Sequence, residues 1–126
     1  KIIKMRQKNA KQLISKLAKF QEISILNSPS GYEHIYQMFT IKLNSKKIRD
    51  GLHTFLKKKR IFTKVYFFPI HLTEFYKKKF PNSGKSLSNT EKLSNQLLTL
   101  PLYPNMTSEE KQYLIESISE FFEKVK

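Results

Sequence analysis

Apolar residues recur at helical spacing near both ends of the chain. The first such stripe predicts a helix from Ile2 to Phe20 and consists of Ala10, Leu13, Ile14, Leu17 and Phe20. The other side of this helix is rich in Lys and Gln. That pattern is typical either of a membrane-surface or calmodulin-target helix or of a helix that docks its stripe on a protein core. We favour the second interpretation.

The last stripe follows a capping box, Thr107-x-x-Glu110, in which the threonine oxygen and the glutamate satisfy free amide hydrogens at a helix start. The helix predicted beyond it has five apolar residues on one face, Leu114, Ile118, Phe121, Phe122 and Val125. Burial at roughly 1.5–3 kcal/mol per residue makes this helix a main contributor to the expected core.

Strand-forming and turn-forming residues fill the chain between these helices. We predict short strands at 23–26 and 98–100 and longer strands at 36–43 and 61–67. Helices are predicted at 46–59, 71–80 and 88–97, with a turn at 27–31 and a loop at 81–86.

The helix predicted at 46–59 has clear signals at both ends. Asn44 and Ser45 offer a cap at its start. Arg60 stands at its end, where the left-handed backbone of the position after a helix favours glycine. Either Arg60 adopts that backbone, at a cost of about 1 kcal/mol, or the helix ends in another way.

Composition bounds the class of protein. The 126 residues suffice for one compact domain with a core and are too few for two ordinary domains. Cysteine is absent, which excludes a disulfide framework and a thiolate metal site and fits a reducing compartment. No apolar run approaches the roughly 20 residues of a membrane-spanning helix. The chain begins at Lys1 without a methionine, so we expect a fragment of a longer protein.

The net charge of +14 raises nucleic acid or an anionic surface as a partner. Only Arg6, Arg49 and Arg60 are arginines, however, and proteins that read bases and phosphates depend on arginine. The lysines are scattered over several predicted elements. We therefore interpret them as solvated surface, balanced by an acidic partner domain in a longer protein.

Residues that carry chemistry are sparse. His34, His53 and His71 are far apart in the sequence and no cysteine accompanies them, so a metal site is not expected. His53 falls off the apolar face of its helix, and we expect it to be exposed. The three glycines form no phosphate-binding loop, and no nucleophile–base pair or pair of acid–base carboxylates is evident. We expect no catalytic residue in this chain.

The most informative segment is Val65-Tyr66-Phe67-Phe68-Pro69-Ile70-His71-Leu72. Pro69 cannot donate to a ladder, so the strand before it should stop there. Tyr66, Phe67 and His71 then lie in a stiff segment just past a strand end, where loops commonly carry function.

This segment, followed by Leu98-Thr-Leu-Pro-Leu-Tyr-Pro104 and Thr107-Ser-Glu-Glu110, resembles the DegT/DnrJ/StrS family of pyridoxal-phosphate-dependent sugar aminotransferases. The likeness is to the C-terminal third of that family. His34-Ile-Tyr-Gln-Met-Phe-Thr-Ile41 is similar to its first small-domain strand, and Arg49-Asp50 with Leu52 and Leu56 to its next helix.

The resemblance implies a division of the chain and a fold. Residues 1–22 would be a linking helix from a missing large domain, and residues 23–126 the C-terminal small domain. The implied fold is α/β (α+β-like), with a small, mostly antiparallel sheet and helices packed largely on one face. This is the arrangement in the C-terminal domain of aspartate-aminotransferase-like enzymes.

The resemblance also implies what the whole enzyme does. Pyridoxal phosphate is held by a lysine of the large domain, and an amino acid, usually glutamate, supplies the amino group that passes to a nucleotide-linked keto sugar. The implied enzyme is a cytoplasmic homodimer of polysaccharide biosynthesis. This chain would hold no catalytic or cofactor-binding residue and would be inactive alone.

Three residues are the substrate contacts that the resemblance implies: His71, Tyr66 and His34. Each has a structural alternative: His71 caps the helix expected near Leu72, Tyr66 buries its ring, and His34 caps or pairs locally. Many family members carry His-Tyr in place of Tyr66-Phe67, so a role of that histidine does not transfer to this chain.

Two other classes of function stay open. One is a stand-alone basic module for nucleic acid or an anionic surface, whose affinity would fall steeply with salt. The other is a regulatory or structural domain that keeps the fold without catalysis. A cofactor-binding domain encoded ahead of Lys1 would distinguish the aminotransferase from both.

Overall fold

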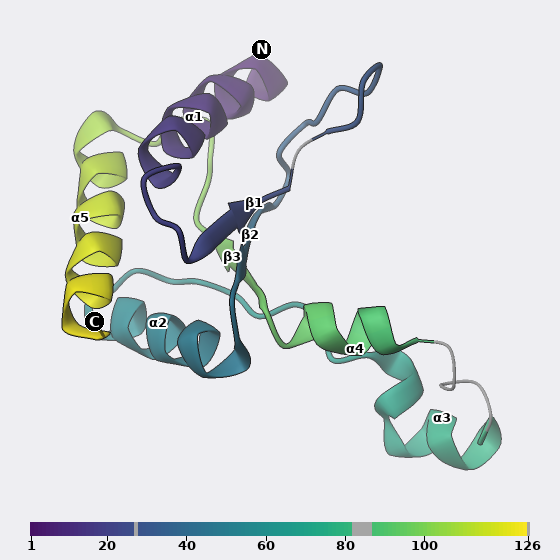
Figure 1. The fold of residues 1–126 in the computed structure, drawn as a ribbon. Coiled ribbons are helices and arrows are strands. Elements are labelled where there is room, and N and C mark those ends of the chain that lie inside the picture. Colours follow the sequence, from purple (N-terminus) through teal and green to yellow (C-terminus); the bar gives the residue numbers. More distant parts are fainter. Residues whose placement is uncertain (27, 82–86, 126) are drawn as a thin grey trace.

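The computed structural model describes residues 1–26, 28–81 and 87–125. A three-stranded antiparallel sheet in the order β1-β2-β3 lies at its centre, with strands Ile23–Ile25, Phe39–Leu43 and Leu97–Leu100. The longer helices are α1 (Ile2–Leu17), α2 (Lys46–Lys58) and α5 (Ser108–Val125). They lie together to one side of the sheet, as Figure 1 shows. The mixed α/β fold with a small antiparallel sheet is confirmed.

The two faces of the sheet differ because side chains alternate along each strand. The inward face packs on the long helices and consists of Ile23, Ile25, Phe39, Ile41, Leu43, Leu98 and Leu100. The other face, which we call the open face, carries Ser24, Thr40, Lys42, Leu97 and Thr99. On this face the hydroxyl oxygens of Thr40 and Thr99 lie 2.8 Å apart, a cross-strand hydrogen bond.

The predicted helical stripes form the core. Leu13 and Leu17 of α1, Leu52 and Leu56 of α2, and Leu114 and Ile118 of α5 are all almost completely buried. Phe20 is also buried, although α1 ends at Leu17, and its ring packs against Phe122. Val125 was expected on the buried face and is 56% exposed, because it lies in the last turn of α5.

A buried polar cluster joins α1 to α5. Lys111 donates from Nζ to Asn9 Oδ1 at 3.0 Å and to Gln12 Oε1 at 2.7 Å. Asn9 in turn donates from Nδ2 to the carbonyl oxygens of Tyr103 and Pro104. Because Asn9 and Lys111 are both buried, these bonds satisfy groups that would be costly to leave unpaired.

Two strand predictions need correction. β2 begins at Phe39 instead of residue 36, because Tyr36 has a φ of 50° and cannot continue a strand. The segment 61–67 is not a strand and forms one isolated bridge, Lys64 with Thr99. The next hydrogen-bonded pair of that ladder would place Phe62 opposite Pro101, which has no N–H to donate.

The helices that lie away from the core are shorter than predicted. The segment 71–80 is divided into a 3-10 turn, Ile70–Leu72, and α3, Glu74–Lys79, because Thr73 has an extended backbone. The helix expected at 88–97 is α4, Ser88–Ser94, and Leu97 already belongs to β3. Residues 82–86 of the predicted loop, and Asn27 of the predicted turn, lie outside the described residues.

The backbone at Arg60 determines how α2 ends. Its φ is 61°, so Arg60 adopts the left-handed backbone. The Arg60 N–H donates to Lys57 O and the Ile61 N–H to Leu56 O, the two bonds of a Schellman motif. The buried Ile61 side chain supplies the apolar contact that accompanies this motif.

Replacing Arg60 with glycine should therefore raise the free energy of unfolding by about 1 kcal/mol, since glycine has no Cβ penalty at a positive φ. Urea unfolding of the 126-residue chain would measure this. Arg60→Ala is the matched control, because alanine keeps the Cβ and should change stability little. A glycine variant no more stable than the alanine variant would contradict the interpretation.

Candidate functional site

The open face of the sheet is flanked by two projecting parts of the chain. One is the arm, residues 28–38, which connects β1 to β2, and the other contains α3 and α4. In Figure 1 the part with α3 and α4 extends to the side away from α1 and α5, and the arm projects beside the N-terminal half of α1. A hollow of about 330 Å³ lies where the arm meets the sheet, lined by Ile25, Leu26 and residues 34–40.

His34 lies in the arm, is exposed and pairs locally. Its Nδ1 accepts a hydrogen bond from the Tyr36 N–H at 2.9 Å, and the two rings lie 4.2 Å apart. Gln7 of α1 donates to the His34 carbonyl oxygen and to Glu33, which ties the arm to the first helix. Local pairing of His34 is thus confirmed. Its Nε2 has no partner among the described residues, and a substrate contact through that atom stays a prediction.

His71 lies inside the 3-10 turn and does not cap a helix, so that alternative is wrong. Its Nε2 lies 3.1 Å from Glu91 Oε1, and only 9% of its side chain is exposed. The contact joins the aromatic segment, residues 65–72, to α4. A ligand would have to meet His71 through Nδ1 or replace Glu91, so its substrate role stays a prediction.

The large apolar side chains around His71 are mostly exposed. Phe67 is 74% exposed, Phe68 67% and Ile70 62%. Tyr66 is partly buried, its ring lies 4.9 Å from that of Phe67, and Lys64 Nζ lies 5.9 Å from its centroid. The Tyr66 hydroxyl makes no hydrogen bond within the described ranges. Its ring is partly packed without a bond that satisfies the hydroxyl, and a substrate contact of Tyr66 stays a prediction.

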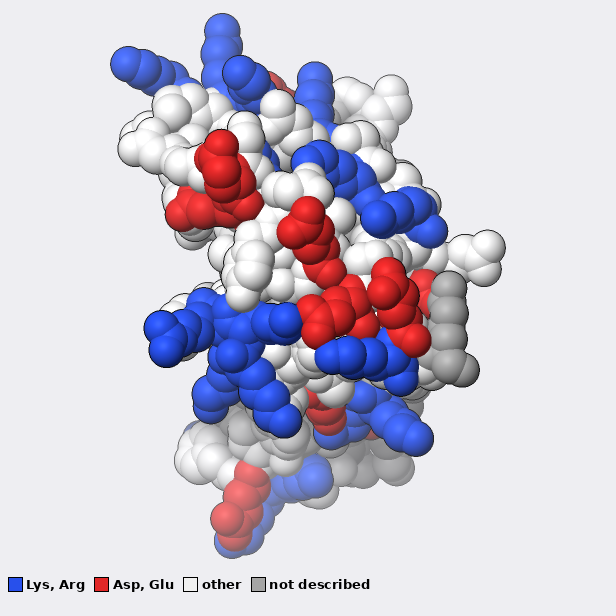
Figure 2. Space-filling model, turned by 90° about the vertical axis from the view of Figure 1, so that its left-hand side faces the viewer, with Lys and Arg blue, Asp and Glu red and all other residues white. Residues whose placement is uncertain are grey.

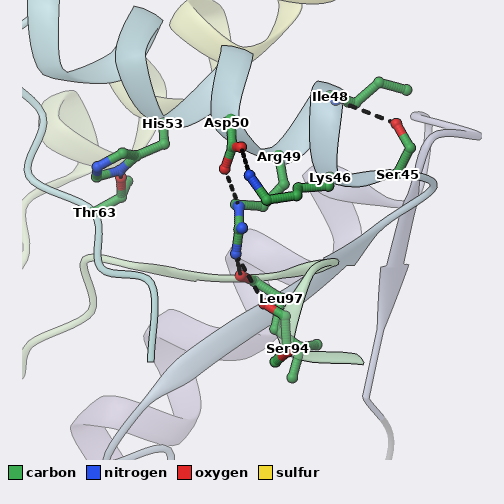
Figure 3. Close-up of polar contacts among 9 residues, drawn as sticks. All are labelled: Ser45, Lys46, Ile48, Arg49, Asp50, His53, Thr63, Ser94 and Leu97. Atoms are coloured by element: carbon green, nitrogen blue, oxygen red, sulfur yellow. Dashed lines mark hydrogen bonds and ion pairs between the residues drawn. The ribbon is translucent and has the colours of Figure 1, made fainter. Parts of the chain in front are cut away.

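Arg49 makes several hydrogen bonds where α2 meets the start of β3. Nothing in the sequence indicated these contacts. It is 4% exposed, and Nη1 donates to the carbonyl oxygens of Ser94 and Leu97 at 3.0 and 3.3 Å. Its Nε donates to Asp50 at 2.6 Å. Figure 3 shows this chain of contacts, which fixes α2 to the junction of α4 and β3.

His53 was expected to be exposed and is instead partly buried. Its Nδ1 lies 2.6 Å from the Thr63 hydroxyl, and Thr63 is itself buried. Figure 3 shows the pair between α2 and the segment that follows it. The prediction failed because helical periodicity does not report what packs beside a helix.

Charges of both signs intermingle on the face that contains α5. Figure 2 shows acidic side chains across the middle of this face, between groups of Lys and Arg. Glu120 pairs with both Lys59 and Lys124, which hold the pKa of its carboxyl below the ordinary value. This face is therefore not the uniform cationic surface that nucleic-acid binding requires. Among the described residues no helix is long and apolar enough to cross a membrane, and no group of acidic and histidine side chains is arranged for a metal ion.

The chain matches the DegT/DnrJ/EryC1/StrS aminotransferase family over residues 1–119 and belongs to it. This family is pyridoxal-phosphate-dependent. Of the proteins similar in sequence, one is a "pleiotropic regulatory protein" of Geobacillus stearothermophilus, 34% identical over 73% of this chain and 24% of the relative.

Solved structures of other proteins have the same fold. NtdA of Bacillus subtilis, solved with bound cofactor PMP, is 27% identical with a TM-score of 0.80, over 97% of this chain and 28% of NtdA. PseC of Helicobacter pylori, an aminotransferase involved in the biosynthesis of pseudoaminic acid, is 18% identical with a TM-score of 0.85, over 98% of this chain and 33% of PseC. The chain thus spans roughly a quarter to a third of the proteins that it matches.

The residues of this chain do not fit pyridoxal phosphate as its own cofactor. Two of the three least exposed lysines among the described residues, Lys59 and Lys111, are already engaged by Glu120 and by Asn9 with Gln12. The third, Lys42, lies in strand β2, and the described residues contain no glycine-rich loop that would enclose the phosphate of the cofactor.

The stability of the chain should depend on pH through Asp50. The hydrogen bond from Lys46 holds the pKa of Asp50 below its ordinary value of 3.8; burial opposes this, and the hydrogen bond and charge of Arg49 reinforce it. A lowered folded pKa means that the charged carboxylate stabilises the fold above pH 3.8, and that this is lost as pH falls through the folded value. Asp50→Asn should remove this dependence, by less than about 1 kcal/mol because the carboxylate is partly solvated.

Urea unfolding of the wild type and Asp50→Asn between about pH 5 and pH 2 would measure the difference. Glu74→Gln, which removes an exposed ion pair with Lys78 on α3, is the control. Parallel pH profiles for the wild type and Asp50→Asn would contradict the expectation.

Proposed function

We propose that this chain is the C-terminal small domain of a pyridoxal-phosphate-dependent sugar aminotransferase. The whole enzyme transfers the amino group of glutamate to a nucleotide-linked keto sugar. The observation that carries the proposal is the family match over residues 1–119 in a chain that spans 28–33% of solved family structures. Such a chain is one part of a larger enzyme whose cofactor site lies elsewhere.

The distribution of apolar surface supports a missing partner domain. Large side chains exposed on the segment 62–75 include Phe62 at 80%, Phe67 at 74% and Phe75 at 62%. Several large apolar side chains exposed along one segment suit an interaction site. We propose that it meets the large domain of the same chain, with residues 1–22 as the link and residues 23–126 as the small domain.

The proposed enzyme is a cytoplasmic homodimer of polysaccharide biosynthesis, and His71, Tyr66 and His34 face its substrates. The absence of cysteine is compatible with that compartment. Tyr66 is the strongest of the three, because its hydroxyl has no hydrogen-bond partner among the described residues. His71 is the weakest, because Glu91 already occupies its Nε2.

A regulatory domain without catalysis is the second candidate, and the name of the relative from Geobacillus stearothermophilus, a pleiotropic regulatory protein, favours it. A basic binding module has less support, because three arginines and the mixed charges of the α5 face do not suit it. It predicts an affinity for DNA that falls steeply with salt.

The isolated 126-residue chain should show no transaminase activity and no visible absorption band from pyridoxal phosphate. The protein encoded by the whole parent gene should show both, with glutamate as donor. Cofactor spectra and amino-transfer assays on the two proteins would test this. A parent gene that encodes no large domain, or a longer protein that binds no cofactor, would contradict the proposal.

Tyr66→Phe in the full-length enzyme should raise the KM of one substrate about 3- to 10-fold and leave kcat nearly unchanged, because one neutral hydrogen bond is lost. Steady-state kinetics with each substrate varied would measure this. Tyr113→Phe is the matched control, since the Tyr113 hydroxyl bonds the Lys59 carbonyl oxygen away from the open face. Equal effects of the two substitutions would argue against substrate binding by Tyr66.

A further inference from the structure

We propose that Lys42 binds an anionic oxygen of a substrate, a carboxylate or a phosphate, on the open face of the sheet. The proposal rests on the proposed function and adds a specificity-determining residue to it. Lys42 lies in the central strand, and its register partners are Ser24 of β1 and Leu97 of β3.

The first step is the unmatched charge of Lys42. Among the described residues the least exposed lysines are Lys42, Lys59 and Lys111. Lys59 is paired with Glu120 at 2.6 Å, and Lys111 donates to two amide oxygens. Lys42 makes no hydrogen bond or ion pair in the same set of residues. No side chain among the described residues neutralises the charge of Lys42, so its ammonium group is available to an anion from outside the chain.

The second step is the absence of a neighbouring acid on this face. None of the residues of β1, β2 and β3 is acidic. Glu22, the acidic residue just before β1, lines a hollow with Phe20 and Phe122 on the helical side. The strands of the open face therefore hold no carboxylate, and no acidic side chain among the described residues pairs with Lys42.

The third step is the hydroxyl pair beside Lys42. Thr40 lies two residues away on the same strand and face, and its hydroxyl bonds that of Thr99 at 2.8 Å. One hydroxyl of such a pair donates to the other, which leaves the second with a free O–H. The face thus presents an ammonium group and one hydroxyl donor, a combination suited to a carboxylate or phosphate oxygen.

Position agrees with this chemistry. The open face lies between the arm and the part of the chain that contains α3 and α4, on the side away from the long helices (Figure 1). Both substrates of the proposed reaction are anions, since glutamate carries carboxylates and a sugar nucleotide carries phosphates. Kinetics must therefore distinguish the two sources.

The test compares Lys42→Met, Lys42→Arg and the wild type as full-length enzymes. Methionine keeps much of the apolar stem and removes the charge, and arginine keeps the charge. Two quantities are measured: the KM for L-glutamate in the first half-reaction, and the Kd for UDP, dTDP and GDP by calorimetry. We expect Lys42→Met to raise one of the two about 10- to 100-fold, because one charge-assisted hydrogen bond is lost, and to change kcat little. Lys42→Arg should recover most of it.

The constant that changes, KM for glutamate or Kd for the nucleotides, identifies the anion, and a change in either one supports the proposal. Lys47→Met, at an exposed lysine in the first turn of α2, is the control and should change neither constant. Wild-type kinetics test the proposed function separately, because an inactive wild type would refute that function whatever Lys42 does. In an active enzyme, an unchanged KM and an unchanged Kd in Lys42→Met would overturn the assignment. A lower melting temperature with both constants unchanged would also overturn it, because Lys42 would then pair with a carboxylate of the large domain.

Discussion

The burial of one face of β2 is the constraint on which the rest of the structure depends. β2 is the central strand, so its register determines the faces of both β1 and β3. Phe39, Ile41 and Leu43 are buried against the long helices, and a shift by one residue would exchange them for Thr40 and Lys42. The same alternation that closes the core therefore leaves a mostly polar face on the other side of the sheet.

Polar groups position the elements around this core. Arg49 holds α2 against the junction of α4 and β3, and the Asn9–Lys111 pair holds α1 against α5. Each is buried and has its donors satisfied mainly by backbone carbonyl or amide oxygens, so removal of either would leave unpaired groups inside. Outside the core, the His71–Glu91 contact links the aromatic segment to α4. The exposed rings of Phe67 and Phe68 therefore lie next to a 3-10 turn that this contact holds in place.

Much of this fold could be predicted from local sequence patterns. Periodicity was sufficient for the stripe of α1, for the inward face of α5 up to Phe122 and for the alternation in β2, because each pattern reflects which face meets the core. The Ser45 cap and the Thr107–Glu110 capping box are also local, and both hydrogen-bond as expected. The family resemblance, tied to residues in order along the chain, was confirmed by the match over residues 1–119.

The failures involve contacts between distant residues. The segment 61–67 has strand-forming residues, but whether it pairs depends on what lies opposite, and that includes Pro101. Neither the bond of His53 to Thr63 nor that of His71 to Glu91 has a sequence signal, since the partners come from other elements. Arg49 was noticed only as part of a family motif, and its buried contacts with carbonyl oxygens depend on tertiary structure.

The single bridge between Lys64 and Thr99 has a consequence for solubility. A small sheet offers bare edges, and a bare edge is a template on which a second chain can form a strand. Lys64 occupies both backbone groups of Thr99, and Pro101 interrupts the row of donors two residues further on. The outer side of β3 is thereby blocked to intermolecular strand addition, although no fourth strand is formed there.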